Sequence, residues 1–193
     1  MIKIETPFTR EKLADLKAGD NVLISGVIYT ARDAAHKRLV DDHAAGRDLP
    51  FDPKGACIYY VGPTPTAPGQ VIGSAGPTSS YRMDPFSPIM MDLGAIGMIG
   101  KGRRNQEVID KIKETGAVYF AAIGGAAAII KDRIKECEII AYDDLGAEAV
   151  RRLVVKDFPA TVIIDSKGNN LYEMGVEAVS YTHLRAHETL RYL

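Results

Sequence analysis

Three segments of this sequence combine a cationic side chain with residues that mark a strand end or a helix start. Arg32 lies in YTARDAAHKR, Arg82 follows Thr78 in GPTSSYRMD, and Lys101 lies between two glycines in GKG. Guanidinium, ammonium and hydroxyl groups are the groups that hydrogen-bond carboxylate or phosphate oxygens. Each segment alone is more typical of a polar surface turn, but together they would present three cations to one anionic ligand.

The segment around Arg32 also carries groups that could hold or transfer a proton. Asp33 follows Arg32 directly, and His36 lies one helical turn further on, so Arg32 and His36 would share a helix face. An imidazole on a partly apolar face is usually a buried structural residue, but beside an anion-binding arginine it becomes a candidate proton donor or acceptor. With the hydroxyl of Thr78, this residue set matches a small dicarboxylate and a proton transfer.

The GKG segment does not follow the Walker A pattern. That pattern would require Gly at position 95 and Ser or Thr at position 102, where this chain has Ala95 and Gly102. The glycines still allow a ligand to approach the backbone closely. A module that binds an anion or a nucleotide without catalysis is therefore an open alternative. A structural subunit whose loops only complete an interface is another.

The composition narrows the class of protein. The chain has 193 residues, 46% of them apolar and 25% charged, and a net charge of -1. This length suits one domain with a sizeable core. The charge does not indicate a nucleic-acid or membrane surface, and no apolar run approaches the roughly 20 residues of a membrane helix. Because the amino-terminal stretch is charged and lacks the apolar region of a signal peptide, we expect a cytoplasmic protein.

The chain has two cysteines, and they do not form a metal-binding pattern. Cys57 and Cys137 lie far apart and make no C-x-x-C pair. An iron-sulfur cluster usually takes more thiolates than this chain offers. We expect both to be buried reduced thiols, and we assign no metal ligands to this chain.

The order of the elements predicts an α/β domain. Strands are predicted over 21–30, 56–63, 69–77, 93–102, 117–125, 138–144, 150–159 and 160–168. Helices are predicted over 30–46, with Thr30 as N-cap and Gly46 as the stop, over 103–116, and over 126–137. A cluster of strands followed by alternating strands and helices favours a mixed, partly barrel-like sheet flanked by helices.

The carboxyl-terminal residues are expected to lie outside the domain. Residues 179–193, VSYTHLRAHETLRYL, resemble translated cloning sequence, so the predicted domain covers 1–178 and the rest is a non-native tail. The alternative is a genuine helix in which His183 and His187 have a spacing that can bind metal.

Five motifs together resemble one known family. YTARDAAHKR, GPTSSYRMD, IGKG, AIGGAAA and VKDFPATVIIDSKGN occur in this order in class I iron-sulfur fumarate hydratases. The resemblance is to the C-terminal domain of the one-chain enzymes and to the beta subunit of the two-chain enzymes. It extends from Met1 to about Gly175. The L-tartrate dehydratase beta subunit is similar in the first three motifs and remains an alternative.

The resemblance implies a fold, a reaction and a partner. The fold would be a swivelling β/β/α domain. The activity would be that of a hydro-lyase, the interconversion of fumarate and (S)-malate in the tricarboxylic acid cycle. A [4Fe-4S] cluster would be held by three cysteines of a cluster-bearing alpha subunit, and this chain would be active only with that subunit. In isolation we expect a homodimer.

The resemblance also implies a role for each candidate residue. Arg32, Arg82 and Lys101 would bind the carboxylate groups of the dicarboxylate substrate. Thr78 would take the C3 proton of malate or return it, and a threonine needs a neighbouring base for this work. His36 would act in acid/base chemistry or hydrogen bonding, and Asp33 would orient the other groups.

Overall fold

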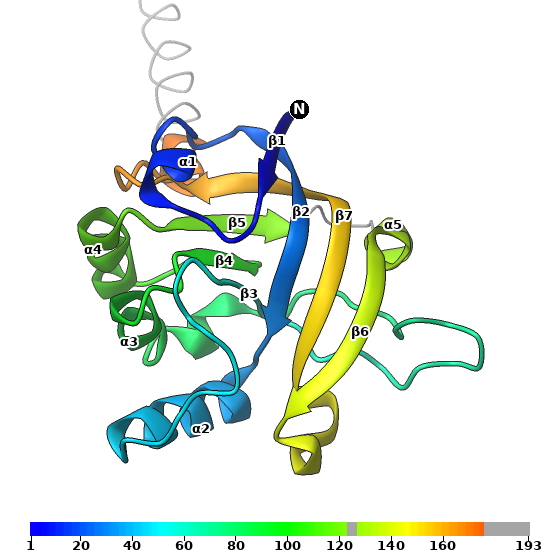
Figure 1. Cartoon of the computed structure of the whole chain (residues 1–193). Helices are drawn as coiled ribbons and strands as arrows, with labels where there is room; N and C mark the ends of the chain where they lie inside the picture. Colours follow the sequence, from blue (N-terminus) through cyan, green and yellow to red (C-terminus); the bar gives the residue numbers. More distant parts are fainter. Residues whose placement is uncertain (123–126, 176–193) are drawn as a thin grey trace, which may run out of the picture.

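The computed structural model describes residues 1–122 and 127–175 (Figure 1). The predicted tail, with His183 and His187, lies outside the described residues, and so does the centre of the AIGGAAA motif. The boundary proposed after residue 178 therefore stays a prediction.

Seven strands form one sheet, most of which closes into a barrel (Figure 1). The strands are β1 (Ile2–Glu5), β2 (Asn21–Thr30), β3 (Cys57–Tyr59), β4 (Gly97–Gly100), β5 (Val118–Ala122), β6 (Ile134–Ala141) and β7 (Val150–Ile164). Their order is β1-β2-β3-β4-β5-β7-β6, and β2 also pairs with β7, so five strands close on themselves. Neighbours from β1 to β5 run parallel, whereas β7 is antiparallel to its partners.

The helices lie outside this sheet. They are α1 (Arg10–Ala14), α2 (Asp33–Ala44), α3 (Ser87–Asp92), α4 (Gln106–Thr115) and α5 (Ala127–Arg133), with the 3-10 helices η1 (Ser80–Met83) and η2 (Asp143–Glu148). Figure 1 shows α3 and α4 side by side next to β4 and β5, with α2 at the bottom of the view. The predicted mixed α/β fold with a partly barrel-like sheet and flanking helices is confirmed.

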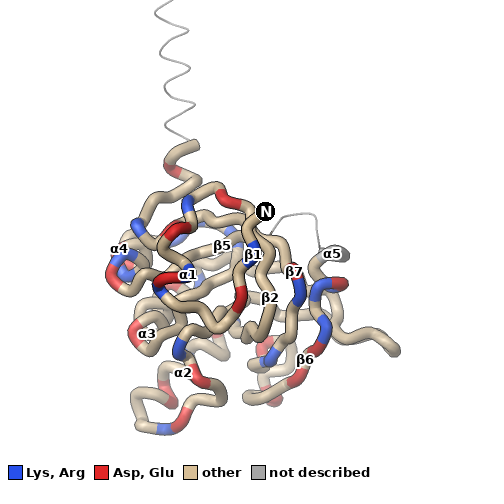
Figure 2. The backbone as a smooth tube through the Cα atoms, turned by 45° about the horizontal axis from the view of Figure 1, so that its top comes forward, with Lys and Arg blue, Asp and Glu red and all other residues tan. Residues whose placement is uncertain are grey.

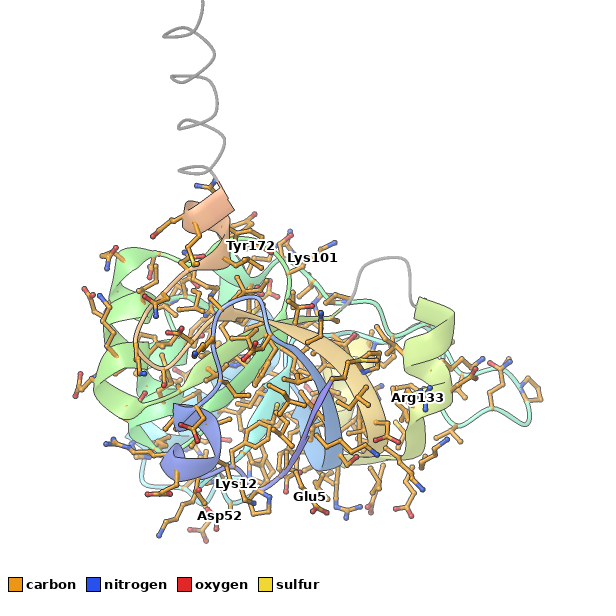
Figure 3. All side chains as sticks on the ribbon, turned by 90° about the horizontal axis from the view of Figure 1, so that it is seen from above. Glu5, Lys12, Asp52, Lys101, Arg133 and Tyr172 are labelled. Carbon is orange, nitrogen blue, oxygen red and sulfur yellow. The ribbon has the colours of Figure 1, made fainter. Side chains whose placement is uncertain are left out.

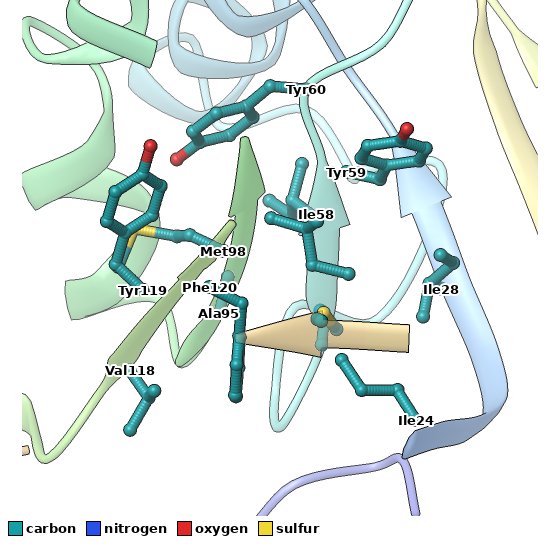
Figure 4. Close-up of a cluster of buried hydrophobic side chains, with 14 of the residues drawn as sticks. Ile24, Ile28, Ile58, Tyr59, Tyr60, Ala95, Met98, Val118, Tyr119 and Phe120 are labelled. Atoms are coloured by element: carbon teal, nitrogen blue, oxygen red, sulfur yellow. The ribbon is translucent and has the colours of Figure 1, made fainter. Parts of the chain in front are cut away.

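Buried apolar side chains fill the space between the sheet and the helices. The close-up in Figure 4 shows Ile24 and Ile28 of β2 near Ile58 of β3, with Val118 and Phe120 of β5 across the cluster. All five are at most 1% exposed. Such close packing makes the strand ends rigid, and the site loops begin at these ends.

Residues at its own ends are sufficient to define helix α4. Asn105 caps it, since its Oδ1 accepts the Val108 N–H at 2.9 Å, and Gly116 ends it with a φ of 72°. Val108, Ile109 and Ile112 are buried on one face, as the spacing predicted.

The predicted start of α2 was wrong. Thr30 is not the N-cap but the last residue of β2, where its hydroxyl accepts the Arg151 N–H at 3.0 Å. Pairing of Thr30 with β3 and β7 keeps it in the sheet. Arg32 is the N-cap instead, and its side chain makes no capping hydrogen bond.

Four other predicted elements were wrong or misplaced. Residues 69–77 form no strand, because they contribute only an isolated bridge between Pro77 and Val61. The proline-rich loop that precedes them projects from the body of the protein (Figure 1). The helix predicted over 126–137 ends at Arg133, and the following residues join β6. The strands predicted over 150–159 and 160–168 are one strand, β7, because a bulge opposite Ser25 accommodates the bend near Asp157. Strand β1 and helix α1 were not predicted.

Charges of both signs are interspersed along the chain. Figure 2 shows lysine or arginine next to aspartate or glutamate on α4 and on β6. This mixture agrees with the net charge of -1. The three cationic segments are therefore a local feature and not part of a uniformly basic face.

Candidate anion-binding site

The predicted site residues follow the carboxyl ends of three adjacent parallel strands. Arg32 comes after β2, Thr78 and Arg82 come in the long connection after β3, and Lys101 comes directly after β4. Because parallel neighbours end on the same edge of a sheet, their loops meet there. The order β2-β3-β4 thus brings together segments that are far apart in the sequence.

Arg32 is held from two sides. Its Nη2 lies 3.1 Å from Oε1 of Glu148, and its side chain is 24% exposed. On the other side lies Gly62, where a Cβ atom would come within 3.0 Å of Arg32 Cδ and Nη1. A glycine at position 62 is therefore needed for the guanidinium to take this place.

Asp33 joins the first two segments. Its Oδ2 lies 3.8 Å from Arg82 Nη1, and its Oδ1 lies 3.7 Å from Arg32 Nε. Both distances are long, and all three side chains are partly exposed, so water screens these attractions. The structure therefore places two guanidinium groups around one carboxylate without saturating either of them.

The second and third segments are joined by Ser80. Its backbone N–H donates to the Lys101 carbonyl at 2.9 Å, and its Oγ accepts the Lys101 N–H at 3.0 Å. Gly100 makes this junction possible, since a Cβ there would lie 1.9 Å from Ser80 Oγ. The Lys101 side chain is exposed, on the opposite side of the body from Lys12 and Asp52 in the view of Figure 3.

Thr78 is partly exposed on the same loop. Its backbone N–H donates to the Tyr60 carbonyl at 2.8 Å, which fixes the loop to the residue that follows β3. Of the hydroxyls in this stretch, Ser80 is fully buried and structural, whereas Thr78 is partly exposed. This division was not predicted from the sequence.

A buried polar network lies behind these loops, and sequence reasoning missed it. The Arg104 side chain is 0% exposed; its Nε donates to Asp84 Oδ1 at 2.6 Å and its Nη2 to Ser87 Oγ at 2.6 Å. The guanidinium lies over the rings of Tyr60 and Tyr119, whose hydroxyls point toward each other in Figure 4. The residues that surround the Arg104 guanidinium lie too far apart in the sequence for a local pattern to predict their contact.

Tyr119 connects this network to the site. Its hydroxyl lies 2.9 Å from Ser80 Oγ. Burial raises the pKa of the Tyr119 phenol above its ordinary value, so the group stays protonated. It donates to the Gly102 carbonyl at 2.9 Å, which can only accept, and accepts from the Ser80 hydroxyl. Ser80 in turn holds the Lys101 backbone, so the network supports the position of the lysine.

His36 lies beneath the surface at the start of α2. Its ring is fully buried, with Nδ1 3.0 Å from the Arg32 carbonyl and the Tyr60 ring packed edge-on against it. Because a carbonyl can only accept, Nδ1 carries the proton. Burial lowers the pKa of His36 from 6.5 to about 4, so the imidazole is neutral at pH 7. His36 is thus brought next to Arg32, as predicted, while its acid/base role stays a prediction.

Glu148 is the other residue that sequence reasoning missed. Besides contacting Arg32, its Oε2 accepts the Ala34 N–H at 3.1 Å, and so provides the cap that Arg32 does not. A carboxylate at this position also interacts favourably with the helix dipole. The acid lies far from α2 in sequence and was not among the predicted site residues.

Three polar atoms at the start of α2 are buried without a hydrogen-bond partner in the described part of the chain. They are Arg32 Nε, Asp33 Oδ1 and His36 Nε2. Buried polar groups in folded proteins are nearly always paired. Their concentration at one point indicates a place where a ligand or water completes the structure.

Within residues 1–122 and 127–175, no cluster of three or more His, Cys, Asp or Glu side chains could hold a metal ion. Cys57 is buried and Cys137 half-buried, and burial raises the pKa of both thiols above the ordinary value. Among the same residues, no helix is long and apolar enough to cross a membrane.

Comparisons with known proteins agree with the motif resemblance. The Fumarase C-terminus family model matches residues 1–175. A putative class I fumarate hydratase of Geobacillus stearothermophilus is 41% identical over 178 residues, which are 90% of this chain and 34% of that protein. The anaerobic class I fumarate hydratase of Escherichia coli is 37% identical over 164 residues, 84% of this chain and 30% of that enzyme.

A shorter relative matches along most of its own length. A putative L(+)-tartrate dehydratase subunit beta of Methanocaldococcus jannaschii is 37% identical over 171 residues, 86% of this chain and 88% of that subunit. The chain thus spans about a third of the fumarate hydratases that it matches, but nearly all of the tartrate dehydratase subunit. On the family match and these identities, the chain belongs to the Fumarase C-terminus family.

Proposed function

We propose that this chain is the beta subunit of an iron-sulfur hydro-lyase that interconverts fumarate and (S)-malate. One observation carries the proposal: Arg32 and Arg82 come together around Asp33 at the edge where Lys101 emerges. Guanidinium pairs suit a ligand with two carboxylates. The fumarate hydratases among the relatives support the choice of reaction.

The binding residues divide the dicarboxylate between them. Arg32 and Arg82 bind its carboxylate groups, with Asp33 orienting both guanidinium groups between turnovers. Lys101 adds a positive charge from the GKG loop, where it binds a carboxylate or stabilises developing negative charge. The exposed fractions of 24% for Arg32 and 46% for Arg82 leave both accessible to a ligand.

Thr78 and His36 are the proposed acid/base residues. Thr78 takes the C3 proton of malate or returns it. A neutral imidazole leaves His36 Nε2 able to accept a proton, and that atom has no other hydrogen-bond partner among the described residues. Because the ring is enclosed, it can exchange a proton only with a group that enters beside Nε2.

The thiols of this chain do not fit a [4Fe-4S] cluster. Cys57 is enclosed in β3, and Cys137 lies on β6, which does not pair with β3. The cluster therefore belongs to a cluster-bearing alpha subunit, which shares the active site with this chain. The roles above concern only what this chain supplies: charge, orientation and proton transfer.

Tartrate is the second candidate substrate. It is favoured by the coverage of the tartrate dehydratase subunit, because that relative has nearly the same length as this chain. The two dicarboxylates differ in hydroxyl groups and not in the carboxylates that the arginines would bind. The same cationic loops therefore suit either one.

An anaerobic turnover assay tests the proposal. Fumarate, malate and tartrate are offered to this chain alone and to a complex reconstituted with a cluster-loaded alpha subunit, and light scattering reports whether the isolated chain is a dimer. Turnover of fumarate and malate by the complex only would support the proposal. Turnover of tartrate alone would change the substrate. A complex that turns over none of them but binds nucleotide would replace the enzyme with a binding module.

A further inference from the structure

Glu148 uses both of its carboxylate oxygens at the start of α2. Oε1 lies 3.1 Å from Arg32 Nη2, and Oε2 accepts the Ala34 N–H at 3.1 Å. One side chain from η2 thus holds both the guanidinium and the backbone of the loop that carries it. The Glu148 side chain is 22% exposed, so most of it is enclosed by the protein.

The segment that carries Glu148 is itself firmly attached. The pair between Arg38 of α2 and Asp144, with hydrogen bonds of 2.7 and 2.9 Å, adds little to this attachment because it is exposed to water. Arg151 donates from Nη1 to the carbonyls of Ala147 and Ala149, and from Nη2 to that of Gly146. Glu148 is therefore fixed before any ligand arrives, which is what a positioning group requires.

We propose that Glu148 is the positioning residue of the anion site, and that it acts through Arg32. This inference rests on the proposed function. Both Glu148 oxygens are occupied within the chain, so the residue contacts the protein and not the substrate. Its effect is to aim the remaining N–H groups of Arg32, including the unpaired Nε, at the incoming carboxylate.

The positioning role predicts the opposite of a simple charge effect. Glu148 is an anion beside an anion site, so Coulomb repulsion alone predicts that its removal strengthens dicarboxylate binding. Without Glu148, however, the nearest carboxylate to Arg32 is Asp33, 3.7 Å from Nε. The guanidinium would turn toward Asp33, and dicarboxylate binding would weaken.

The first test compares kinetics of variants in the assembled complex. Glu148→Ala should lower kcat/KM by about ten- to hundred-fold, mostly through KM, because the Arg32 guanidinium loses the charged acceptor that holds it. Glu148→Gln, which keeps one acceptor oxygen, should lie between. Asp144→Ala is the matched control on η2, because it breaks an exposed pair that does not contact Arg32, and should stay within about two-fold.

A double-mutant cycle separates positioning from a general structural effect. In an Arg32→Ala background, Glu148→Ala should have no further effect on KM, because the residue through which it acts is gone. Full additivity of the two substitutions would overturn the inference. An unchanged or lower KM in Glu148→Ala, or an equally large effect of Asp144→Ala, would also overturn it.

Two readouts do not depend on turnover. The amide hydrogen exchange of Ala34 in the full chain should accelerate in Glu148→Ala and not in Asp144→Ala. Succinate, an unreactive dicarboxylate, should bind the Glu148→Ala complex at least ten-fold more weakly than the parent complex. If the parent complex binds succinate but turns over no dicarboxylate, the proposed reaction is wrong. The positioning role of Glu148 is then tested by Ala34 exchange and succinate binding alone. If Ala34 exchange is unchanged, or the parent binds no succinate, the inference about Glu148 fails.

Discussion

The two ends of the closed sheet differ in how their polar groups are used. At the amino ends of β3, β4 and β5 lies a cavity of about 420 Å³ with an apolar floor and a rim of both charges, lined among others by Phe8, Met91, Ile96, Arg10, Lys54 and Asp92. Two of its carboxylates are paired within the chain, because Lys111 lies 3.0 Å from Asp92 and 2.9 Å from Glu114. The carboxyl ends carry the three buried atoms without partners.

A concave surface alone therefore does not mark a binding site in this protein. Among the described residues, no residue that lines the amino-end cavity has a buried polar side-chain atom without a partner, whereas the carboxyl end has three such atoms beside two arginines. Ligands of open parallel sheets bind at the carboxyl ends of the strands, and the same rule fits this closed sheet. Matched substitutions at the two ends of the sheet, or at a buried and an exposed position, test this difference.

The largest contrast is expected between two threonines. Thr78→Ala in the assembled complex should lower kcat by about 10²- to 10⁴-fold, the range for loss of a positioned acid/base group, with little change in thermal stability. Thr9→Ala, at the amino end, should leave kcat unchanged and cost about 1 kcal/mol of stability, because Thr9 caps α1. Parallel turnover and denaturant unfolding check both. Normal turnover of the Thr78 variant would remove that hydroxyl from the mechanism.

The buried arginine should matter more than any ion pair at the amino end. Arg104→Met leaves Asp84 buried without its partner and should lower the free energy of unfolding by about 3–5 kcal/mol. Lys111→Met, which removes a partly exposed ammonium, should have a much smaller effect, because its partners Asp92 and Glu114 are exposed and water screens these ion pairs. Urea unfolding at pH 7 measures both, and equal midpoints would show that the Arg104 network does not support the fold.

The junction between the second and third segments should be sensitive to one methyl group. Gly100→Ala places a Cβ against Ser80 Oγ and should cost about 1–3 kcal/mol of stability while displacing Lys101. At Gly102, with a φ of 84° and open space around the Cβ position, alanine should cost only about 1 kcal/mol. Thermal unfolding and the KM for malate would reveal the difference. A KM that rises equally in both variants would contradict the proposed role of Ser80.

The smallest expected effect is a pH dependence. The folded-state pKa of His36 is lowered to about 4 from an ordinary value of 6.5, so the unfolded chain binds more protons between these values. Stability should therefore be unaffected above pH 6.5 and should fall on acidification below it, by about 1 kcal/mol per pH unit. His36→Gln should remove this slope between pH 6.5 and 5, whereas His43→Gln, at an exposed position of the same helix, should keep it. A slope retained by His36→Gln would assign it to other groups.

Much of this molecule follows from local sequence. The strand over 21–30 and most of helix α4, with its stop at Gly116, were predicted because each depends on residues within a few positions; the Asn105 cap was not predicted. The candidate residues Arg32, Asp33, His36, Thr78, Arg82 and Lys101 were also chosen from the sequence. Their motifs lie at strand ends and helix starts, where short-range patterns are strongest.

The remaining features depend on contacts between distant segments. Thr30 looks like a helix cap in the sequence, but its pairing with Arg151 keeps it in the sheet. Closure of β2 on β7 brings η2 to α2 and so places Glu148 against Arg32. Burial leaves Arg104 and Asp84 as partners for each other, and makes His36 neutral. Local sequence thus specifies which side chains are available for chemistry. Which of them meet, and with what charge, depends on the folded chain, because burial and long-range pairing arise only on folding.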